Sequence, residues 1–213
     1  MLVISHRGYH KGSSENTLEA FQAALSLGVD GIETDVRLSR DGELVLCHDR
    51  IAPDGRAVSA LTRRELASIL GHPVPTLAEA LDLPGKILWN IEIKVPQAFS
   101  PALRLLESHP KAPDLLITSF WHSAVAEHCQ SSPLRFGLLF ADRPATTDAF
   151  LACLRAIPRL AAVVWDYEIL DPELLPVCAS HGIQVFTYGA STPGEHVRCV
   201  ELGLAGVITD HPV

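Results

Sequence analysis

The strongest constraint on the fold is a regular alternation of short β-branched runs with stretches of helical spacing along the whole chain. The runs that predict strands are 2–5, 31–38, 87–93, 115–119, 135–140, 162–165, 184–187 and 206–209. A strand, a crossover helix and a second strand together predict parallel pairing. Eight such units predict an α/β fold, a (β/α)8 barrel of the TIM type.

The helical patterns lie between these strands, at 17–27, 63–70, 77–81, 102–108, 123–130, 147–157, 172–181 and 193–202. For the first of them, Asn16 is the expected N-cap, with Glu19 as its capping-box partner. Gly28 is expected to end that helix. The competing fold is an open doubly wound sheet, which predicts a glycine-rich first turn that this sequence lacks.

One segment departs from the alternation. A turn at Asp41-Gly42 predicts that 44–47 returns as a hairpin partner of the second strand. The next segment, about 49–85, holds four prolines and two short helical patterns but no strand, so we expect a short insertion after the second strand. Residues 1–213 then form a single domain near the low end of the usual barrel length.

Charge and cysteine usage exclude several classes of partner. The formal net charge of −8 argues against a nucleic-acid partner and an anionic membrane surface. No apolar run approaches the roughly 18 residues of a membrane span, so no stable membrane association is expected. Five widely spaced cysteines suit neither a disulfide framework nor a zinc site, and reduced thiols in a cytoplasmic protein are the expected state.

Charged residues interrupt two of the predicted strands. Glu33 and Asp35 are two positions apart, so both carboxylates face one side of the second strand. Glu92 and Lys94 share a face of the next strand in the same way. Buried carboxylates need a neutralising cation, and three of them suit an oxygen-liking ion such as Mg2+ or Ca2+.

Histidines are predicted at the same rim, where the catalytic residues of barrels lie. His6-Arg7 follows the first strand, and His48-Asp49 follows the hairpin. Two histidines, with Arg7 and Lys94, complement an anionic substrate. Each pattern alone is common on protein surfaces, where an exposed ion pair contributes little. Their convergence on one rim predicts an active site.

A family resemblance covers essentially the whole chain and rests on motifs in a fixed order. These are His6-Arg7-Gly8, Glu15-Asn16-Thr17, the run 28–36, Asp41-Gly42, His48-Asp49, Glu92-Ile93-Lys94, Ser119-Phe120 and the run 206–210. Through them the chain resembles the glycerophosphodiester phosphodiesterase family. The resemblance implies a β/α barrel enzyme that hydrolyses a small-molecule glycerophosphodiester to glycerol 3-phosphate and an alcohol, with Mg2+ or Ca2+ as cofactor.

The resemblance also implies roles for individual residues. The implied acid–base pair is His6 and His48, the metal ligands are Glu33, Asp35 and Glu92, and the phosphate contacts are Arg7 and Lys94. One histidine would deprotonate the attacking hydroxyl, either the glycerol 2-hydroxyl or water, and the other would protonate the leaving alkoxide. The sequence does not assign the two roles between the two histidines.

Five further residues lie outside these assigned roles, and the first two of them have two readings each. Glu15 either contacts the metal or substrate or is a first-turn acid, and Asp49 either orients His48 or belongs to a turn. Phe186 replaces a tryptophan common in the family and is expected to form an apolar wall. For Asp210 we favour a structural role in capping the next turn, and for His10 a loop position.

Two alternative functions stay open. The first is a lysophospholipase D-type lipid phosphodiesterase that uses the same site. The second is a barrel that binds a phosphodiester without cleaving it, although all seven matched positions are intact. Only 43 residues separate His48 from Glu92, which is short for this family and predicts a more open mouth.

Overall fold

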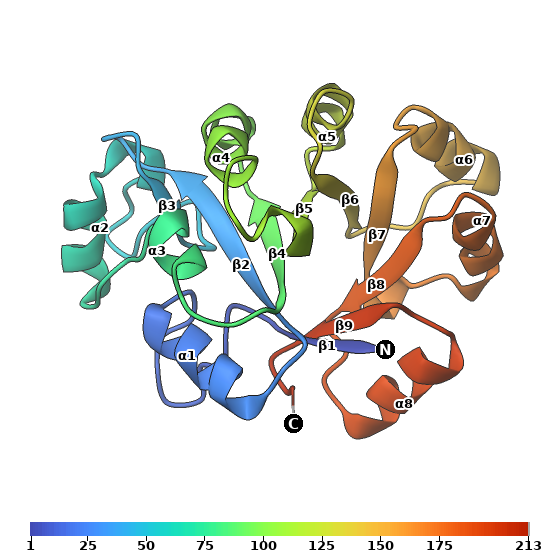
Figure 1. Cartoon of the computed structure of the whole chain (residues 1–213), viewed down its shortest axis with the longest axis horizontal. Helices are drawn as coiled ribbons and strands as arrows, with labels where there is room; N and C mark the ends of the chain where they lie inside the picture. Colours follow the sequence, from blue (N-terminus) through green and yellow to red (C-terminus); the bar gives the residue numbers. More distant parts are fainter. Residues whose placement is uncertain (213) are drawn as a thin grey trace.

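The computed structural model describes residues 1–212, and within them eight parallel strands close into a barrel (Figure 1). They are β1 (Leu2–Ser5), β2 (Gly31–Leu38), β4 (Leu88–Ile93), β5 (Leu115–Ser119), β6 (Arg135–Phe140), β7 (Leu160–Asp166), β8 (Gln184–Tyr188) and β9 (Gly206–Thr209). Each pairs with its neighbours in sequence, and β1 pairs with both β2 and β9. That double pairing closes the barrel and confirms the predicted fold.

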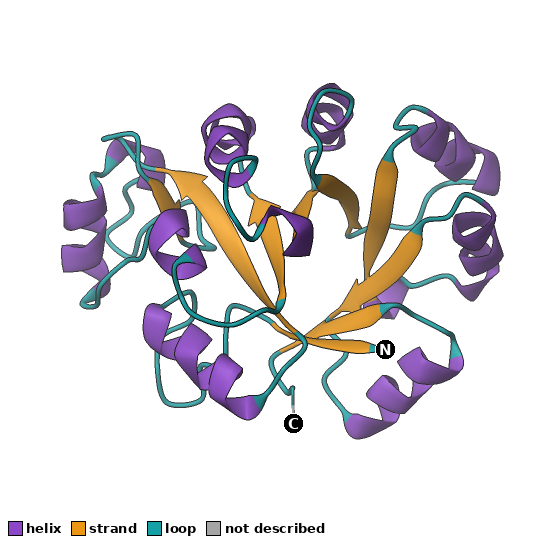
Figure 2. Ribbon diagram, viewed as in Figure 1, coloured by secondary structure: helices purple, strands orange, loops and turns teal. Residues whose placement is uncertain are grey.

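Helices cover the outside of the barrel, as Figure 2 shows. They are α1 (Leu18–Leu27), α4 (Phe99–Leu106), α5 (His122–Cys129), α6 (Thr147–Arg155), α7 (Leu175–Ser180) and α8 (Pro193–Glu201). Short 3-10 turns occupy Pro96–Ala98, Ala112–Asp114, Tyr167–Ile169 and Pro172–Leu174. Among residues 1–212, no helix combines the length and apolarity needed to cross a bilayer.

The first helix ends where predicted but begins one residue later than predicted, at Leu18. Gly28 ends α1 in the left-handed region, with φ of 75°. The N-cap is Thr17, whose hydroxyl accepts a hydrogen bond from the Ala20 N–H at 3.2 Å. The prediction that Asn16 caps this helix is therefore wrong, because its side chain is used inside the barrel mouth.

The segment after β2 forms a small subdomain at one edge of the barrel. Strand β3 (Leu44–Leu46) pairs antiparallel with β2, as the turn at Asp41-Gly42 predicts. A 3-10 turn (Val58–Ala60) and helices α2 (Arg63–Leu70) and α3 (Leu77–Leu81) follow. Both helices begin with a complete capping box. The subdomain has its own apolar cluster, formed by Val45, Ala52, Val58, Leu61, Leu66 and Val74.

Apolar side chains fill the barrel interior below its mouth. They are Ile4, Leu116, Leu139, Ala162, Val164, Phe186 and Ile208. Phe186 is 1% exposed, and a Cβ on Gly206 would lie 2.7 Å from its ring. Phe186 is thus part of the interior packing and is not an exposed wall of the mouth. Tyr188, two residues further along the same strand face, lies nearer the opening.

Candidate active site

Three carboxylates meet where β2 and β4 end. Asp35 is opposite Glu92 in the parallel register, and Glu33 lies two residues before Asp35 on the same face. Glu33, Asp35 and Glu92 are 3%, 1% and 9% exposed. Each offers a carboxylate oxygen that lies within 4.8 Å of the other two. The structure therefore places all three predicted metal ligands together.

The electrostatics of this cluster are those of a site that needs a cation. Burial, with Asp35 and Glu92 nearby, raises the pKa of Glu33 well above its usual value. Burial and Asp35 also raise the pKa of Glu92. Burial alone would raise the pKa of Asp35, but Lys94 and Arg7 outweigh it and lower that pKa. Three buried oxygen ligands suit a hard divalent cation, so the residues present fit Mg2+ or Ca2+.

Two side-chain cations lie directly against the carboxylates. Arg7 places Nε 3.1 Å from Asp35 Oδ2 and Nη1 3.0 Å from both oxygens of Glu15. Lys94 Nζ lies 2.6 Å from Glu92 Oε1 and 3.3 Å from Asp35 Oδ1. Glu15 therefore contacts Arg7 in this structure. An anion entering the mouth would meet both cations beside the carboxylate cluster.

Each candidate catalytic histidine is paired with a carboxylate through Nδ1. His6 Nδ1 lies 2.8 Å from Asp210 Oδ1, and its Nε2 lies 3.9 Å from Glu33 Oε2. His48 Nδ1 lies 2.9 Å from Asp49 Oδ1. Asp49 thus contacts His48, in agreement with one of its two predicted readings. With Nδ1 occupied, Nε2 is the nitrogen that each imidazole has left for proton transfer.

A cavity of about 270 Å3 joins these groups. Its charged lining consists of both histidines, Arg7, Lys94, Glu33 and Glu92, whereas the rest is largely apolar. That apolar part is formed by Phe120, Leu139, Tyr188 and Ile208. Asp35 is buried beside Glu33 and Glu92 and does not line the cavity itself. Burial raises the pKa of Tyr188 to about 12, with Asp166, Glu92 and Asp142 adding to the shift. Tyr188 is therefore neutral near pH 7.

Asn16 and Asp210 belong to the site although the sequence assigned them structural roles. The Asn16 amide donates to Asp35 Oδ2 at 2.9 Å, and its oxygen accepts from the Thr34 hydroxyl at 2.7 Å. This network holds Asp35 in place. The sequence did hold a signal for a role of Asn16 in the site, because Asn16 lies within the family motif Glu15-Asn16-Thr17. Asp210 had a similar signal at the end of the last strand.

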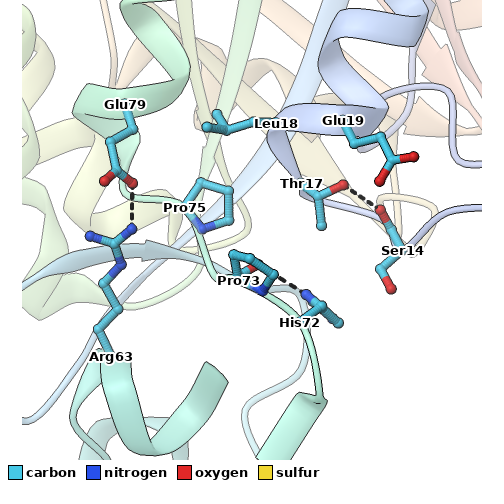
Figure 3. A pocket seen from close by; sticks show the side chains of 9 residues that line it. All are labelled: Ser14, Thr17, Leu18, Glu19, Arg63, His72, Pro73, Pro75 and Glu79. Carbon is cyan, nitrogen blue, oxygen red and sulfur yellow. Dashed lines mark hydrogen bonds and ion pairs between the residues drawn. The ribbon is translucent and has the colours of Figure 1, made fainter. Parts of the chain in front are cut away.

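A larger cavity of about 400 Å3 lies elsewhere, between α1 and the inserted subdomain (Figure 3). Several of its polar side chains have partners within the protein. Arg63 Nη2 contacts Glu79 Oε2 at 2.5 Å, and the Thr17 hydroxyl donates to the Ser14 carbonyl at 2.7 Å. Neither candidate histidine lines it. The candidate site residues instead line the smaller cavity at the barrel mouth.

Known proteins were compared with the chain as a whole. The model of the "Glycerophosphoryl diester phosphodiesterase family" matches residues 6–213. A Mycobacterium tuberculosis protein named "Probable glycerophosphodiester phosphodiesterase 1" is 54% identical over 252 residues, covering 99% of this chain and 89% of that protein. A "Glycerophosphodiester phosphodiesterase" of Caldanaerobacter subterraneus subsp. tengcongensis is 30% identical over 233 residues, covering 99% and 94%.

A solved structure agrees with these sequence matches. The crystal structure of glycerophosphodiester phosphodiesterase from Thermotoga maritima has a TM-score of 0.85 and 26% identity, covering 100% of this chain and 95% of that one. The fold, the carboxylate cluster at the barrel mouth and the match over residues 6–213 lead to one assignment. The chain belongs to the glycerophosphoryl diester phosphodiesterase family.

Proposed function

We propose that the protein hydrolyses glycerophosphodiesters to glycerol 3-phosphate and an alcohol, and that it depends on a divalent cation and on His6 and His48. One observation carries the proposal: Arg7, Lys94 and both histidines line one cavity together with Glu33 and Glu92, two members of the buried carboxylate triad. These groups are able to promote phosphodiester cleavage at neutral pH. The relatives named for this activity support the same substrate class.

The metal would be held by Glu33, Asp35 and Glu92. When bound, Mg2+ or Ca2+ supplies Lewis-acid polarisation of a phosphoryl oxygen. The positions of Arg7 and Lys94 beside the triad suit contacts with the remaining phosphoryl oxygens, whose negative charge increases in the transition state. Together these groups orient the diester and stabilise charge on it.

The two histidines would move the protons. One Nε2 removes a proton from the attacking hydroxyl, and the other donates a proton to the leaving alkoxide, which is a poor leaving group without it. The attacking hydroxyl is that of the glycerol 2-position or of water. Detection of a transient cyclic phosphate by 31P NMR distinguishes the two, because only attack by the glycerol hydroxyl forms that ring.

Release of glycerol 3-phosphate from glycerophosphocholine and glycerophosphoethanolamine tests the proposal. We expect release with Mg2+ or Ca2+ and none with EDTA. His6→Ala and His48→Ala should each lower kcat by about 10²–10⁴-fold. His72→Ala is the matched control, because His72 borders the cavity of Figure 3 and should leave kcat unchanged. Metal-independent release, or full activity of both histidine variants, would refute the proposal.

The same assay includes a lysophospholipid, because a lysophospholipase D would use the same groups. Cleavage of lysophosphatidylcholine but of neither glycerophosphodiester would favour that alternative. Binding of the cation and diester without turnover would favour a non-catalytic barrel. For location we propose the cytoplasm, since all five cysteines are free thiols, which is typical of a reducing compartment.

A further inference from the structure

The pairing of the first and last strands, β1 and β9, brings Asp210 next to His6. Strand β9 pairs in parallel with β1, with Thr209 opposite Ser5. The His6 N–H donates to the Thr209 carbonyl at 3.0 Å. Asp210, the next residue, then places Oδ1 2.8 Å from His6 Nδ1, although the two are 204 positions apart in sequence. Strand pairing therefore determines this contact.

Within residues 1–212, the Asp210 carboxylate has two imidazoles as hydrogen-bond partners. The turn N–H of His211 donates instead to the Thr209 hydroxyl at 3.1 Å. Asp210 Oδ1 has a second histidine neighbour, His10, whose Nε2 lies 3.3 Å away. Among residues 1–212, the contacts of the Asp210 carboxylate are therefore with the two histidines, whereas the sequence favoured a role in capping the next turn.

Asp166 is an example of an acid at a strand end that caps the following turn. It ends β7, and its Oδ1 accepts from the Glu168 N–H at 2.9 Å. Asp210 has a comparable place directly after β9, but its contacts are with histidines. Hydrogen bonding by His6, with His10 adding to it, lowers the pKa of Asp210 to about 2. The carboxylate is therefore ionised near neutral pH and can accept a hydrogen bond from an imidazole N–H.

We propose that Asp210 is the positioning residue of His6: it accepts the Nδ1 proton, fixes one tautomer and directs Nε2 toward the carboxylate triad. An imidazole without this partner populates both tautomers, and only one leaves Nε2 free to accept a proton. His10 holds the same carboxylate oxygen from the other side. The inference rests on the proposed function only for the role of His6 in proton transfer.

His48 has the equivalent partner in its chain neighbour, Asp49. The two carboxylates differ in shielding, because the side chain of Asp49 is 79% exposed and that of Asp210 is 50% exposed. The contact between His48 and Asp49 joins sequence neighbours and needs no tertiary structure. The contact between His6 and Asp210 forms only when the barrel is closed. The orientation of His6 by Asp210 therefore depends on the β1–β9 pairing that closes the barrel.

Steady-state kinetics of Asp210→Asn and Asp210→Ala test the proposal, with Asp166→Asn as the matched control. Asn preserves the volume of Asp, which separates loss of charge from loss of packing. We expect both Asp210 variants to lower kcat by about 10²-fold, with KM within about threefold of wild type. Asp166→Asn should leave both parameters unchanged, and His10→Ala should lower kcat less than Asp210→Ala.

Nitrogen-15 NMR of the histidine rings, with Mg2+ and no substrate, gives a second readout. Wild-type His6 should carry its proton on Nδ1, and Asp210→Ala should shift the population toward the Nε2–H tautomer. An unchanged tautomer overturns the proposal, as does a kcat loss that only follows loss of folded protein by circular dichroism. The NMR readout needs no turnover, so a wild type inactive on every diester would refute the proposed function and still leave this inference testable.

Discussion

At the scale of single residues, Glu33 is the group whose charge is most unfavourable in the metal-free protein. It is 3% exposed, and burial with two carboxylate neighbours raises its pKa. A carboxyl with a raised folded-state pKa binds its proton more tightly in the folded than in the unfolded state. Its contribution to the free energy of unfolding therefore falls as pH rises from the unfolded pKa through the folded one.

Glu33→Gln should remove this dependence. In EDTA, we expect the melting temperature of the variant to rise relative to wild type as pH rises above about 4.5, the ordinary pKa of a glutamate carboxyl. With saturating Mg2+ or Ca2+ the order should reverse, because only the wild type keeps its full ligand set. Differential scanning calorimetry measures both. A gap between the two proteins that is constant with pH would contradict the assignment of the raised pKa to Glu33.

The cysteines make a second prediction at this scale. Burial raises the pKa of Cys47 and of Cys178 to about 11, and it also raises those of Cys129, Cys153 and Cys199. Because the thiolate is the reactive form, Cys47 and Cys178 should react with iodoacetamide about 10²-fold more slowly than ordinary thiols near pH 7.5. Mass spectrometry of native and unfolded protein checks this. Rapid labelling of Cys47 in the native state would contradict it.

At the scale of elements, β8 and β9 show how close packing limits the choice of residue. A Cβ on Gly206 would lie 2.7 Å from the Phe186 ring and 3.1 Å from the Leu2 carbonyl oxygen. The small residue on β9 therefore makes room for the large one on β8. Because β9 also pairs with β1, crowding here would act on the strands that close the barrel.

Gly206→Ala should destabilise the protein by about 1–3 kcal/mol, the usual range for overpacking a core. Gly194→Ala is the matched control, because a Cβ at Gly194 in α8 meets nothing within 4 Å. We expect it to be neutral or to stabilise by up to about 1 kcal/mol, because alanine favours helix over glycine. Urea unfolding measures both. Equal stabilities would show that Phe186 can move away without penalty.

At the scale of the whole molecule, the site joins elements from both ends of the chain. His6 directly follows β1, the three carboxylates lie on β2 and β4, and Asp210 directly follows β9. A ligand that binds at this mouth therefore favours the closed barrel over the unfolded chain. Metal binding and global stability should be linked.

A divalent cation at about 100 times its Kd should raise the free energy of unfolding by about 2.7 kcal/mol. For a chain of this size, that corresponds to a rise in Tm of about 5–10 °C. EDTA should reverse the rise, and Asp35→Asn should abolish it. Thermal unfolding followed by circular dichroism gives the result. An equal rise in wild type and Asp35→Asn would place the cation elsewhere.

Much of this molecule follows from local sequence pattern. Period-2 alternation is a property of any strand, so it already placed Glu33 and Asp35 on one face before any fold was known. Local capping chemistry predicted that Gly28 ends α1. The β/α alternation predicted the barrel, and the structure confirms it with small shifts at strand ends. These features depend on residues only a few positions apart.

Other features were decided by tertiary structure. Asn16 is a residue type typical of helix N-caps, but its side chain donates a hydrogen bond to Asp35. It reaches Asp35 because the loop after β1 lies beside β2. Phe186 and Tyr188 share a strand face, and only the depth of the barrel decides which of them reaches the cavity. Asp210 meets His6 because the last strand pairs with the first. Local sequence determines which way a side chain faces, whereas closure of the barrel determines what it meets there.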